Sequence, residues 1–249
     1  MNQSFRAKLL IDLTWLFSII AGLAITEALQ HFFHQSPAIL SAGIAGLPRL
    51  AAGVGALDVG MLLIFVMTLM TFHISNVMYY RHFYEPEKSR PTGATVAYDY
   101  TAHFVEYLVL FWIAELFQTT AANPHVRPDA FFGLMIALFF LDFLWLVGLK
   151  TMNPPIFKKL GKRWTVHGIA TIVAIIACWG SPHIFFPAHE KAVLPWFFGL
   201  ALCVIAFSNV HDILETYRFY RDEQAAQLEA EAKPRKKKHA STLRPSSPH

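Results

Sequence analysis

The feature that most constrains this chain is a long apolar stretch that carries acidic residues and no basic ones. Residues 98–118, YDYTAHFVEYLVLFWIAELFQ, are long enough to cross a bilayer, which takes about 20 helical residues. At 100° per residue, Asp99, His103 and Glu106 share one narrow stripe, and Glu115 lies half a turn from Glu106. A carboxylate facing lipid costs roughly 2.5–3.5 kcal/mol, so the stripe must face protein or water. We therefore expect the rest of the chain to supply helices that surround this one.

The composition is that of a membrane protein. Of the 249 residues, 55% are hydrophobic and 15% are charged, whereas about 25% are charged in a typical soluble domain. Cys178 and Cys203 both lie inside apolar runs, which favours buried thiols over a disulfide. The pI is near 9.1, but the excess positive charge lies mostly in connections and in the C-terminal tail. The charge therefore indicates membrane topology, and we expect no nucleic-acid partner.

Hydropathy predicts an all-α, polytopic membrane protein with six transmembrane helices and a cytoplasmic tail. Tyr79 and Tyr80, at the end of the second span, are expected at a membrane interface. The predicted regions are a transmembrane domain at 1–215, a cytoplasmic helical extension at 216–232 and a disordered basic tail at 233–249. The predicted spans are 9–31, 57–80, 98–118, 129–149, 164–180 and 192–214.

The distribution of basic residues predicts the orientation. Of the 21 Lys and Arg residues, 18 lie in the two termini and in the second and fourth connections. The three connections on the opposite side carry one each, namely Arg49, Arg127 and Lys191. The positive-inside rule then places both termini in the cytoplasm, and we expect the protein in the cell membrane.

Polar residues inside the spans are the candidate functional groups. With this orientation, the cytoplasmic half holds Asp12, His73, Asn76, Asp99, His103, Glu106, Asp142, His167, Asn209, His211 and Asp212. A smaller outer set consists of Glu27, Asp58 and Glu115. No Lys or Arg lies in the interior of any predicted span, so these carboxylates must be protonated, paired with His, hydrated or bound to a cation.

Three functions fit this pattern. A proton or cation channel or transporter would use Glu106, His103, Asp142, Glu27, Asp58 and Glu115 as exchange or relay sites and needs no cofactor. A membrane redox or metal protein would ligate haem or a metal ion through His73, His103, His167 and His211. A non-catalytic membrane subunit would dock a cytoplasmic partner through its last helix. No hydrolase or phosphate-loop signature is present, which argues against an enzyme, and we assign no catalytic residue.

The expected partners follow from the same features. The spans require a lipid bilayer, and six spans hardly enclose a pore alone, so we expect a homo-oligomer or a membrane complex. The tail contains KPRKKKH at residues 233–239. Each Lys or Arg close to an anionic surface gains about 1 kcal/mol, so the tail is expected to bind anionic lipid.

The topology is testable by cysteine labelling in a background that lacks Cys178 and Cys203. Because the basic connections are predicted to be cytoplasmic, a cysteine at Ser89 or Ser241 should react only from the cytoplasmic side. A cysteine at Ala122 should react only from outside. Labelling of positions 89 and 122 from the same side would exclude the six-span topology.

Overall fold

The computed structural model describes residues 3–34, 56–84, 92–118, 126–152, 154–186 and 190–242, and the regular structure in these ranges is α-helical. This confirms the all-α fold class. The helices are α1 (Gln3–His34), α4 (Ala56–Tyr84), α5 (Gly93–Glu115), α6 (Pro128–Met152), α7 (Pro154–Phe185) and α8 (Glu190–Thr242).

Five of these helices are long and apolar enough to cross a membrane. They are α1, α4, α6, α7 and α8, with apolar segments of 19 to 30 residues. The exception is α5, whose acidic residues and histidine lower its hydropathy. Its polar stripe nevertheless points into the bundle, because Asp99, His103 and Glu106 are each at most 1% exposed. The surrounding helices therefore shield the part of α5 that lipid would not tolerate.

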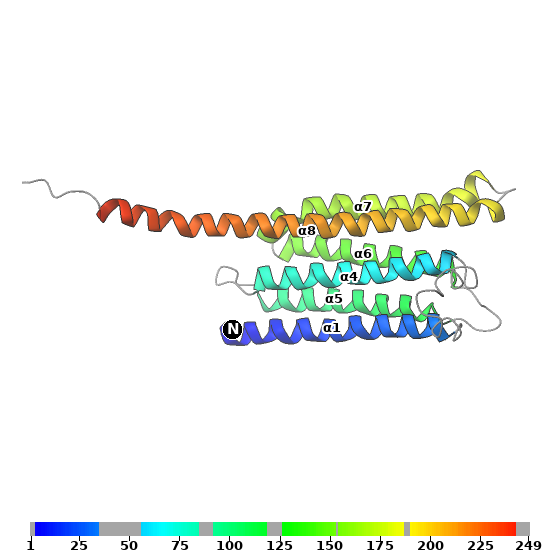
Figure 1. Ribbon diagram of the computed structural model, residues 1–249, viewed down its shortest axis with the longest axis horizontal. Helices are drawn as coiled ribbons and strands as arrows, with labels where there is room; N and C mark the ends of the chain where they lie inside the picture. Colours follow the sequence, from blue (N-terminus) through cyan, green and yellow to red (C-terminus); the bar gives the residue numbers. More distant parts are fainter. Residues whose placement is uncertain are drawn as a thin grey trace, which may run out of the picture.

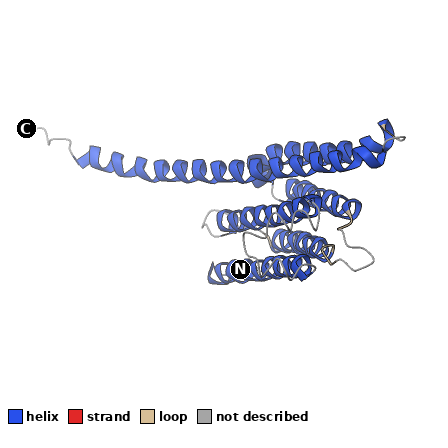
Figure 2. Ribbon diagram, turned by 45° about the vertical axis from the view of Figure 1, so that its right-hand side comes forward, coloured by secondary structure: helices blue, strands red, loops and turns tan. Residues whose placement is uncertain are grey.

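The helices form a closed ring with one extra contact across it. Around the ring the order is α1, α5, α6, α7, α8, α4 and back to α1, and α4 also packs against α5. The helices run roughly parallel or antiparallel, and α8 continues well beyond the others (Figure 1). The first turn of α1 and the departing part of α8 lie at the same end of the bundle (Figure 2). We call this the proximal end and the opposite one the distal end.

The distal half of the interior is an apolar layer. Buried aromatic rings from α4, α6, α8 and the turn that follows α5 meet there, with centroid distances of 5.8 Å for Phe65–Phe117, 6.4 Å for Phe117–Phe131 and 5.2 Å for Phe132–Phe198. These rings are at most 4% exposed. The outward surface is also apolar, with side chains such as Trp15, Trp196 and Phe207 between 66% and 81% exposed. Apolar side chains on both the inside and the outside are typical of a bundle in lipid.

The helices differ from the predicted spans in three places. α7 begins at Pro154, so most of the connection predicted at 151–163 is helical; proline suits a first helical turn, where its missing N–H has no intrahelical partner anyway. Tyr79 and Tyr80 are 1% and 2% exposed, so their predicted place at an interface was wrong, and they are buried against α5 and α6. α8 runs to Thr242 and includes the predicted extension at 216–232. The disorder of 233–249 in solution stays a prediction.

Gly148 permits the close approach of α5 and α6. The Tyr98 hydroxyl donates to the carbonyl oxygen of Leu144 at 2.8 Å and lies 3.3 Å from that of Trp145. A Cβ atom at position 148 would collide with the Tyr98 ring, whereas a Cβ at Gly133 on the same helix would meet nothing within 4 Å.

Gly148→Ala should therefore lower the thermal stability of the purified protein, by about 1–3 kcal/mol if α5 is displaced. Gly133→Ala is the matched control and should leave the melting temperature unchanged. Thermal unfolding followed by tryptophan fluorescence measures both. Equal melting temperatures for the two variants would show that the Tyr98 contact does not limit the helix distance.

Candidate functional site

The predicted stripe of α5 is buried as expected. Its positions 95, 99, 103, 106, 110, 113 and 117 are all buried. The spacing of three and four residues places them on one face. This face is polar in its proximal half, at Asp99, His103 and Glu106, and apolar in its distal half, at Leu110 and Ile113. The apolar half of this face lies in the apolar distal half of the bundle interior, and its polar half lies in the proximal half.

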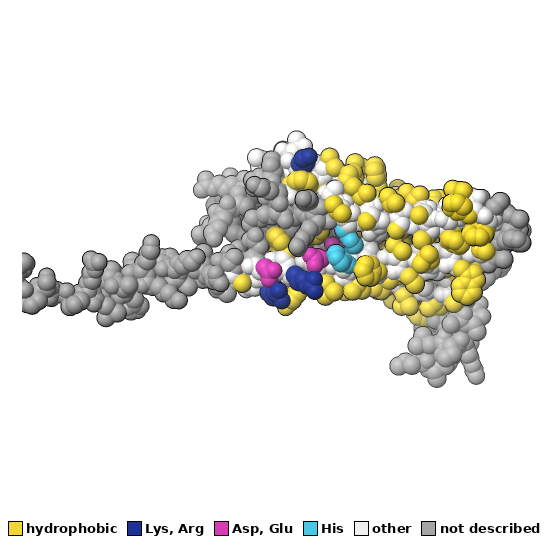
Figure 3. All heavy atoms as spheres, turned by 90° about the horizontal axis from the view of Figure 1, so that it is seen from above, with side chains coloured by type: hydrophobic (Ala, Val, Ile, Leu, Met, Phe, Trp, Pro, Cys, Tyr) yellow, Lys and Arg dark blue, Asp and Glu magenta, His cyan; other side chains and the backbone are white. Residues whose placement is uncertain are grey.

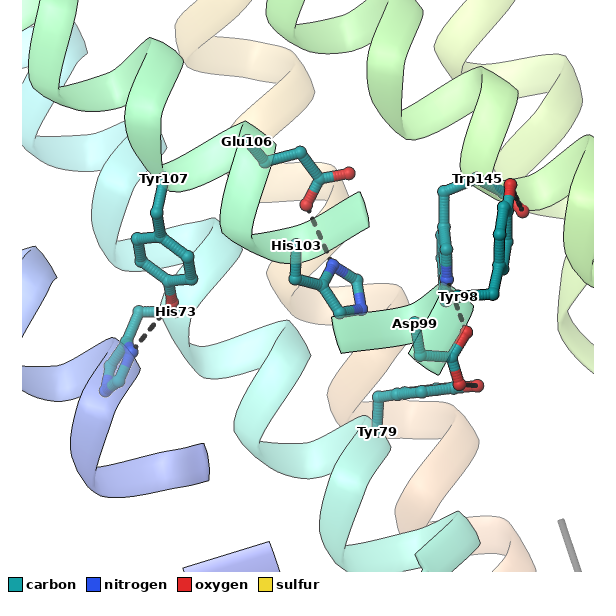
Figure 4. A network of polar contacts seen from close by, with 8 residues as sticks. All are labelled: His73, Tyr79, Tyr98, Asp99, His103, Glu106, Tyr107 and Trp145. Atoms are coloured by element: carbon teal, nitrogen blue, oxygen red, sulfur yellow. Dashed lines mark hydrogen bonds and ion pairs between the residues drawn. The ribbon is translucent and has the colours of Figure 1, made fainter. Parts of the chain in front are cut away.

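Asp99 binds two neutral donors from neighbouring helices. The Tyr79 hydroxyl of α4 donates to Oδ2 at 2.8 Å, and the Trp145 indole of α6 donates to Oδ1 at 2.9 Å. Figure 4 shows both rings pointing at the carboxylate from different sides. A buried carboxylate is costly unless its oxygens are hydrogen-bonded, and these two donors supply bonds without supplying a positive charge.

His103 and Glu106 form the second buried pair of the stripe. Nδ1 of His103 lies 2.8 Å from Oε2 of Glu106, one helical turn away (Figure 4). The imidazole packs against aromatic rings, with its centroid 4.9 Å from that of Trp145 and 5.5 Å from that of Tyr80. Nε2 of His103 and Oε1 of Glu106 have no hydrogen-bond partner within the described chain. Each residue thus keeps one free position for a proton or a water molecule.

His73 of α4 belongs to a separate group. Its Nδ1 lies 3.0 Å from the Tyr107 hydroxyl of α5 (Figure 4), and its Nε2 lies 3.4 Å from Oγ of Ser18 on α1. The Tyr107 ring stacks on Phe17, with centroids 4.8 Å apart. This arrangement holds α1, α4 and α5 together through uncharged partners.

A polar cavity lies beside the stripe, between α4, α6, α7 and α8. Its volume is about 50 Å³, enough for one or two water molecules. Tyr79 and Trp145, the two donors to Asp99, form part of its wall. Asn76, which is 7% exposed, also lines it and has an amide nitrogen without a partner within the described chain. The other polar residues of the wall are Thr71, Ser75, Asp142, His167, Ser208, Asn209 and Asp212.

Two carboxylates face this cavity without a Lys or Arg partner among the described residues. Asp142 of α6 interacts electrostatically with Glu106 and with Asp212 of α8. Asp212 accepts a hydrogen bond of 3.4 Å from the Ser75 hydroxyl. Neither Asp142 nor Asp212 forms an ion pair with Lys or Arg in the part of the chain that the structure describes. Three carboxylates therefore share a neighbourhood that can accommodate protons or a small cation.

The cavity adjoins an open groove between α7 and α8. The groove shares Trp164, His167 and Asp212 with the cavity wall and adds His211 and Glu215. Figure 3 shows histidine and acidic side chains gathered on this face beside a belt of hydrophobic ones. The proximal half of the bundle is thus polar both at this surface and inside.

The four histidines proposed as ligands do not meet at one point. His103 pairs with Glu106, and His73 with Tyr107. His167 and His211 stack on each other, with centroids 4.7 Å apart and an interplanar angle of 23°, and Nε2 of His167 lies 2.8 Å from the Ser208 hydroxyl. The structure therefore places these histidines in three different environments.

The predicted outer set is divided at the distal end. Glu27 of α1 and Glu115 of α5 lie on either side of His31, at 2.6 Å and 3.9 Å from its Nε2. Asp58 is apart from them and accepts a bond of 3.1 Å from the backbone N–H of Val126, just before α6. This bond ties the start of α4 to the segment that leads into α6, which indicates a structural role for Asp58.

Sequence reasoning missed several partners of the predicted residues. Tyr79 was expected at a membrane interface and not beside Asp99, and the packing of Trp145 and Tyr107 was not considered. Pairing between helices leaves no local signal in one sequence. His31 is different, because Glu27 and His31 are four residues apart on one helix, a spacing that brings side chains together and that could have been noticed.

The comparisons with known proteins identify no relative: no family model, no curated protein and no solved structure matches this chain. The site must therefore be interpreted from its own geometry.

The buried Asp99 bonds should contribute more to stability than a similar exposed bond. Asp99→Ala removes the acceptor of two buried donors, and each loss costs about 1–3 kcal/mol. The control is Asp129→Ala, because Asp129 accepts an indole bond of 3.0 Å from Trp179 at an exposed position. Thermal unfolding should show a clearly larger decrease for Asp99→Ala. Equal decreases would mean that the Asp99 bonds are not a major support of the fold.

Proposed function

We propose that this protein is an integral membrane transporter that binds a proton or a monovalent cation at carboxylates in its proximal half. The carboxylates are Asp142 and Asp212 at the cavity, together with Glu106 and its partner His103 on α5. The observation that carries the proposal is the polar cavity, which two acidic side chains line without a Lys or Arg partner among the described residues.

Electrostatics favours a small cation or a proton as the transported species. Carboxylates in a medium of low dielectric repel each other unless a proton or a cation neutralises them. The cavity of about 50 Å³ has room for an ion or for one or two waters, and not for an organic solute. The hydroxyl and amide groups of Ser75, Asn76 and Asn209 are the neutral ligands that such an ion would need.

The apolar distal layer favours a transporter over an open channel. The layer formed by Phe65, Phe117, Phe131, Phe132 and Phe198 lies between the cavity and the distal end. Hydrophobic constrictions exclude ions by excluding water. Transport would then require a second conformation in which this layer opens. Glu27, Asp58 and Glu115 are not part of the proposed exchange site, because none of them lines the cavity.

The proposed topology has six spans, with α5 as the sixth, and both termini in the cytoplasm of a cell membrane. Supporting it are the common end at which α1 begins and α8 departs (Figure 2) and the distribution of basic residues. The proximal end would then face the cytoplasm. Assembly into an oligomer and binding of the tail to anionic lipid are part of the same proposal.

The two other functions receive less support. Haem or metal ligation by His73, His103, His167 and His211 would need these side chains to converge. His167 and His211 stack on each other, but His103 and His73 lie in other environments. Docking of a cytoplasmic partner is favoured by one observation, which is that α8 extends beyond the other helices (Figure 1). Such docking is compatible with transport and does not replace it.

Asp142→Asn should abolish ion flux and leave the protein folded. The change keeps the size of the side chain and removes its charge and its exchangeable proton. In reconstituted vesicles, we expect at least a tenfold loss of flux, measured with a pH-sensitive dye under proton, sodium and potassium gradients. Glu106→Gln should have a similar effect, and His103→Phe should shift the pH dependence.

Asp222→Asn is the matched control, because Asp222 is an exposed acidic residue of α8 that pairs with Arg221 outside the cavity. Its flux should equal that of the parent protein. Unchanged flux in Asp142→Asn, or no flux in the parent protein under any of the three gradients, would overturn the transport proposal.

A further inference from the structure

We propose that Glu27, His31 and Glu115 form a binding site for a divalent transition-metal ion at the distal end of the bundle. The three residues offer one ligand atom each, and these atoms lie within 4.8 Å of one another. Glu27 and His31 come from successive turns of α1, and Glu115 comes from the last turn of α5. The site is separate from the cavity proposed for transport.

The geometry is close to that of a three-ligand metal site. Bonds of about 2.0–2.2 Å to nitrogen and oxygen around a tetrahedral ion place the ligand atoms about 3.4 Å apart. Nε2 of His31 lies 2.6 Å from Oε1 of Glu27 and 3.9 Å from Oε2 of Glu115, on either side of that value. Rotation of the side chains is enough to bring all three atoms to the required distance.

The negative charges of the two glutamates also favour the binding of a cation. Glu27 and Glu115 have no ion-pair partner except His31 in the described chain. A protonated His31 would cancel one of the two negative charges, whereas a divalent ion with neutral His31 cancels both. The imidazole ligand favours a transition metal such as Zn²⁺ or Mn²⁺ over Mg²⁺ or Ca²⁺, which prefer oxygen ligands.

The helix packing holds the ligands in place and leaves the site open. Ala28 and Ala114 are fully buried and let α1 and α5 approach closely. Phe32 packs edge-on against Phe117, with centroids 6.3 Å apart, one turn beyond the site. The side chains of Glu27, His31 and Glu115 are 34%, 21% and 41% exposed, so a metal ion can enter and water can complete its coordination.

Binding is testable on the purified full-length protein after treatment with a chelator. Titration with Zn²⁺ in a calorimeter should show one ion per chain, and Zn²⁺ should raise the melting temperature because it binds the folded state. Mn²⁺ should bind more weakly, and Mg²⁺ should not bind measurably. His31→Gln and Glu115→Gln should each weaken Zn²⁺ binding at least tenfold and abolish the rise in melting temperature.

His34→Gln is the matched control, because His34 is also on α1, one turn further on, and lines the same surface pocket as His31. It should bind Zn²⁺ like the parent protein. If His31→Gln does not fold, Glu115→Gln decides the question alone, since it removes one ligand at an exposed position. Equal Zn²⁺ binding by the parent protein and Glu115→Gln would mean adventitious binding at other histidines and would overturn the proposal. Because no flux is measured, the result is independent of the transport proposal.

Discussion

The structure depends on how carboxylates are hydrogen-bonded in the interior of an apolar helical bundle. An isolated ion in a medium of low dielectric loses several kcal/mol of hydration energy. In this bundle, Asp99 accepts hydrogen bonds from two neutral donors, the Tyr79 hydroxyl and the Trp145 indole. Glu106 is paired with the imidazole of His103. Under the transport proposal, the imidazole partner of Glu106 would leave this carboxylate able to exchange a proton or a cation, which an arginine partner would prevent.

This constraint explains the position of α5. It is the helix with the most polar interior face and the lowest suitability for contact with lipid. It packs against α1, α4 and α6, so its stripe is enclosed. The Tyr98 bonds to α6, the His73–Tyr107 bond to α4 and the Asp99 bonds to both tie α5 to its neighbours by polar contacts. In a bilayer, where apolar contact between helices competes with lipid, such polar bonds and close packing determine which helices associate.

Much of the fold, but less of the site, could be predicted from the sequence. Apolar length predicted the helices, and the 3.6-residue period predicted the buried stripe of α5, because both signals are local. The pairing of Asp99 with Tyr79 and Trp145 joins residues 20 and 46 positions apart, and one sequence contains no information on such pairing. The same limit explains why the outer carboxylates were grouped by depth alone. Asp58 was grouped with Glu27 and Glu115 because the three have similar predicted depths. In the structure, Asp58 points toward the backbone segment before α6, because depth along a helix does not determine the direction of a side chain.

The apolar side chains of α5 between Glu106 and Glu115 separate the proximal polar region from the distal one. If polar residues continued along the whole α5 stripe, water could follow them, and the bundle would leak protons. Leu110, Ile113 and Phe117 occupy the positions that continue the stripe beyond Glu106, so the polar face ends near the middle of the helix. Under the transport proposal, the proximal carboxylates would then exchange ions with one side only in this conformation. The distal Glu27, His31 and Glu115 lie at the ends of α1 and α5, where a bound cation would hold these helices together. A link of this kind would resist separation of α1 from α5, so any opening of the apolar layer would have to come from movement of the helices on the other side of the ring, α6, α7 and α8.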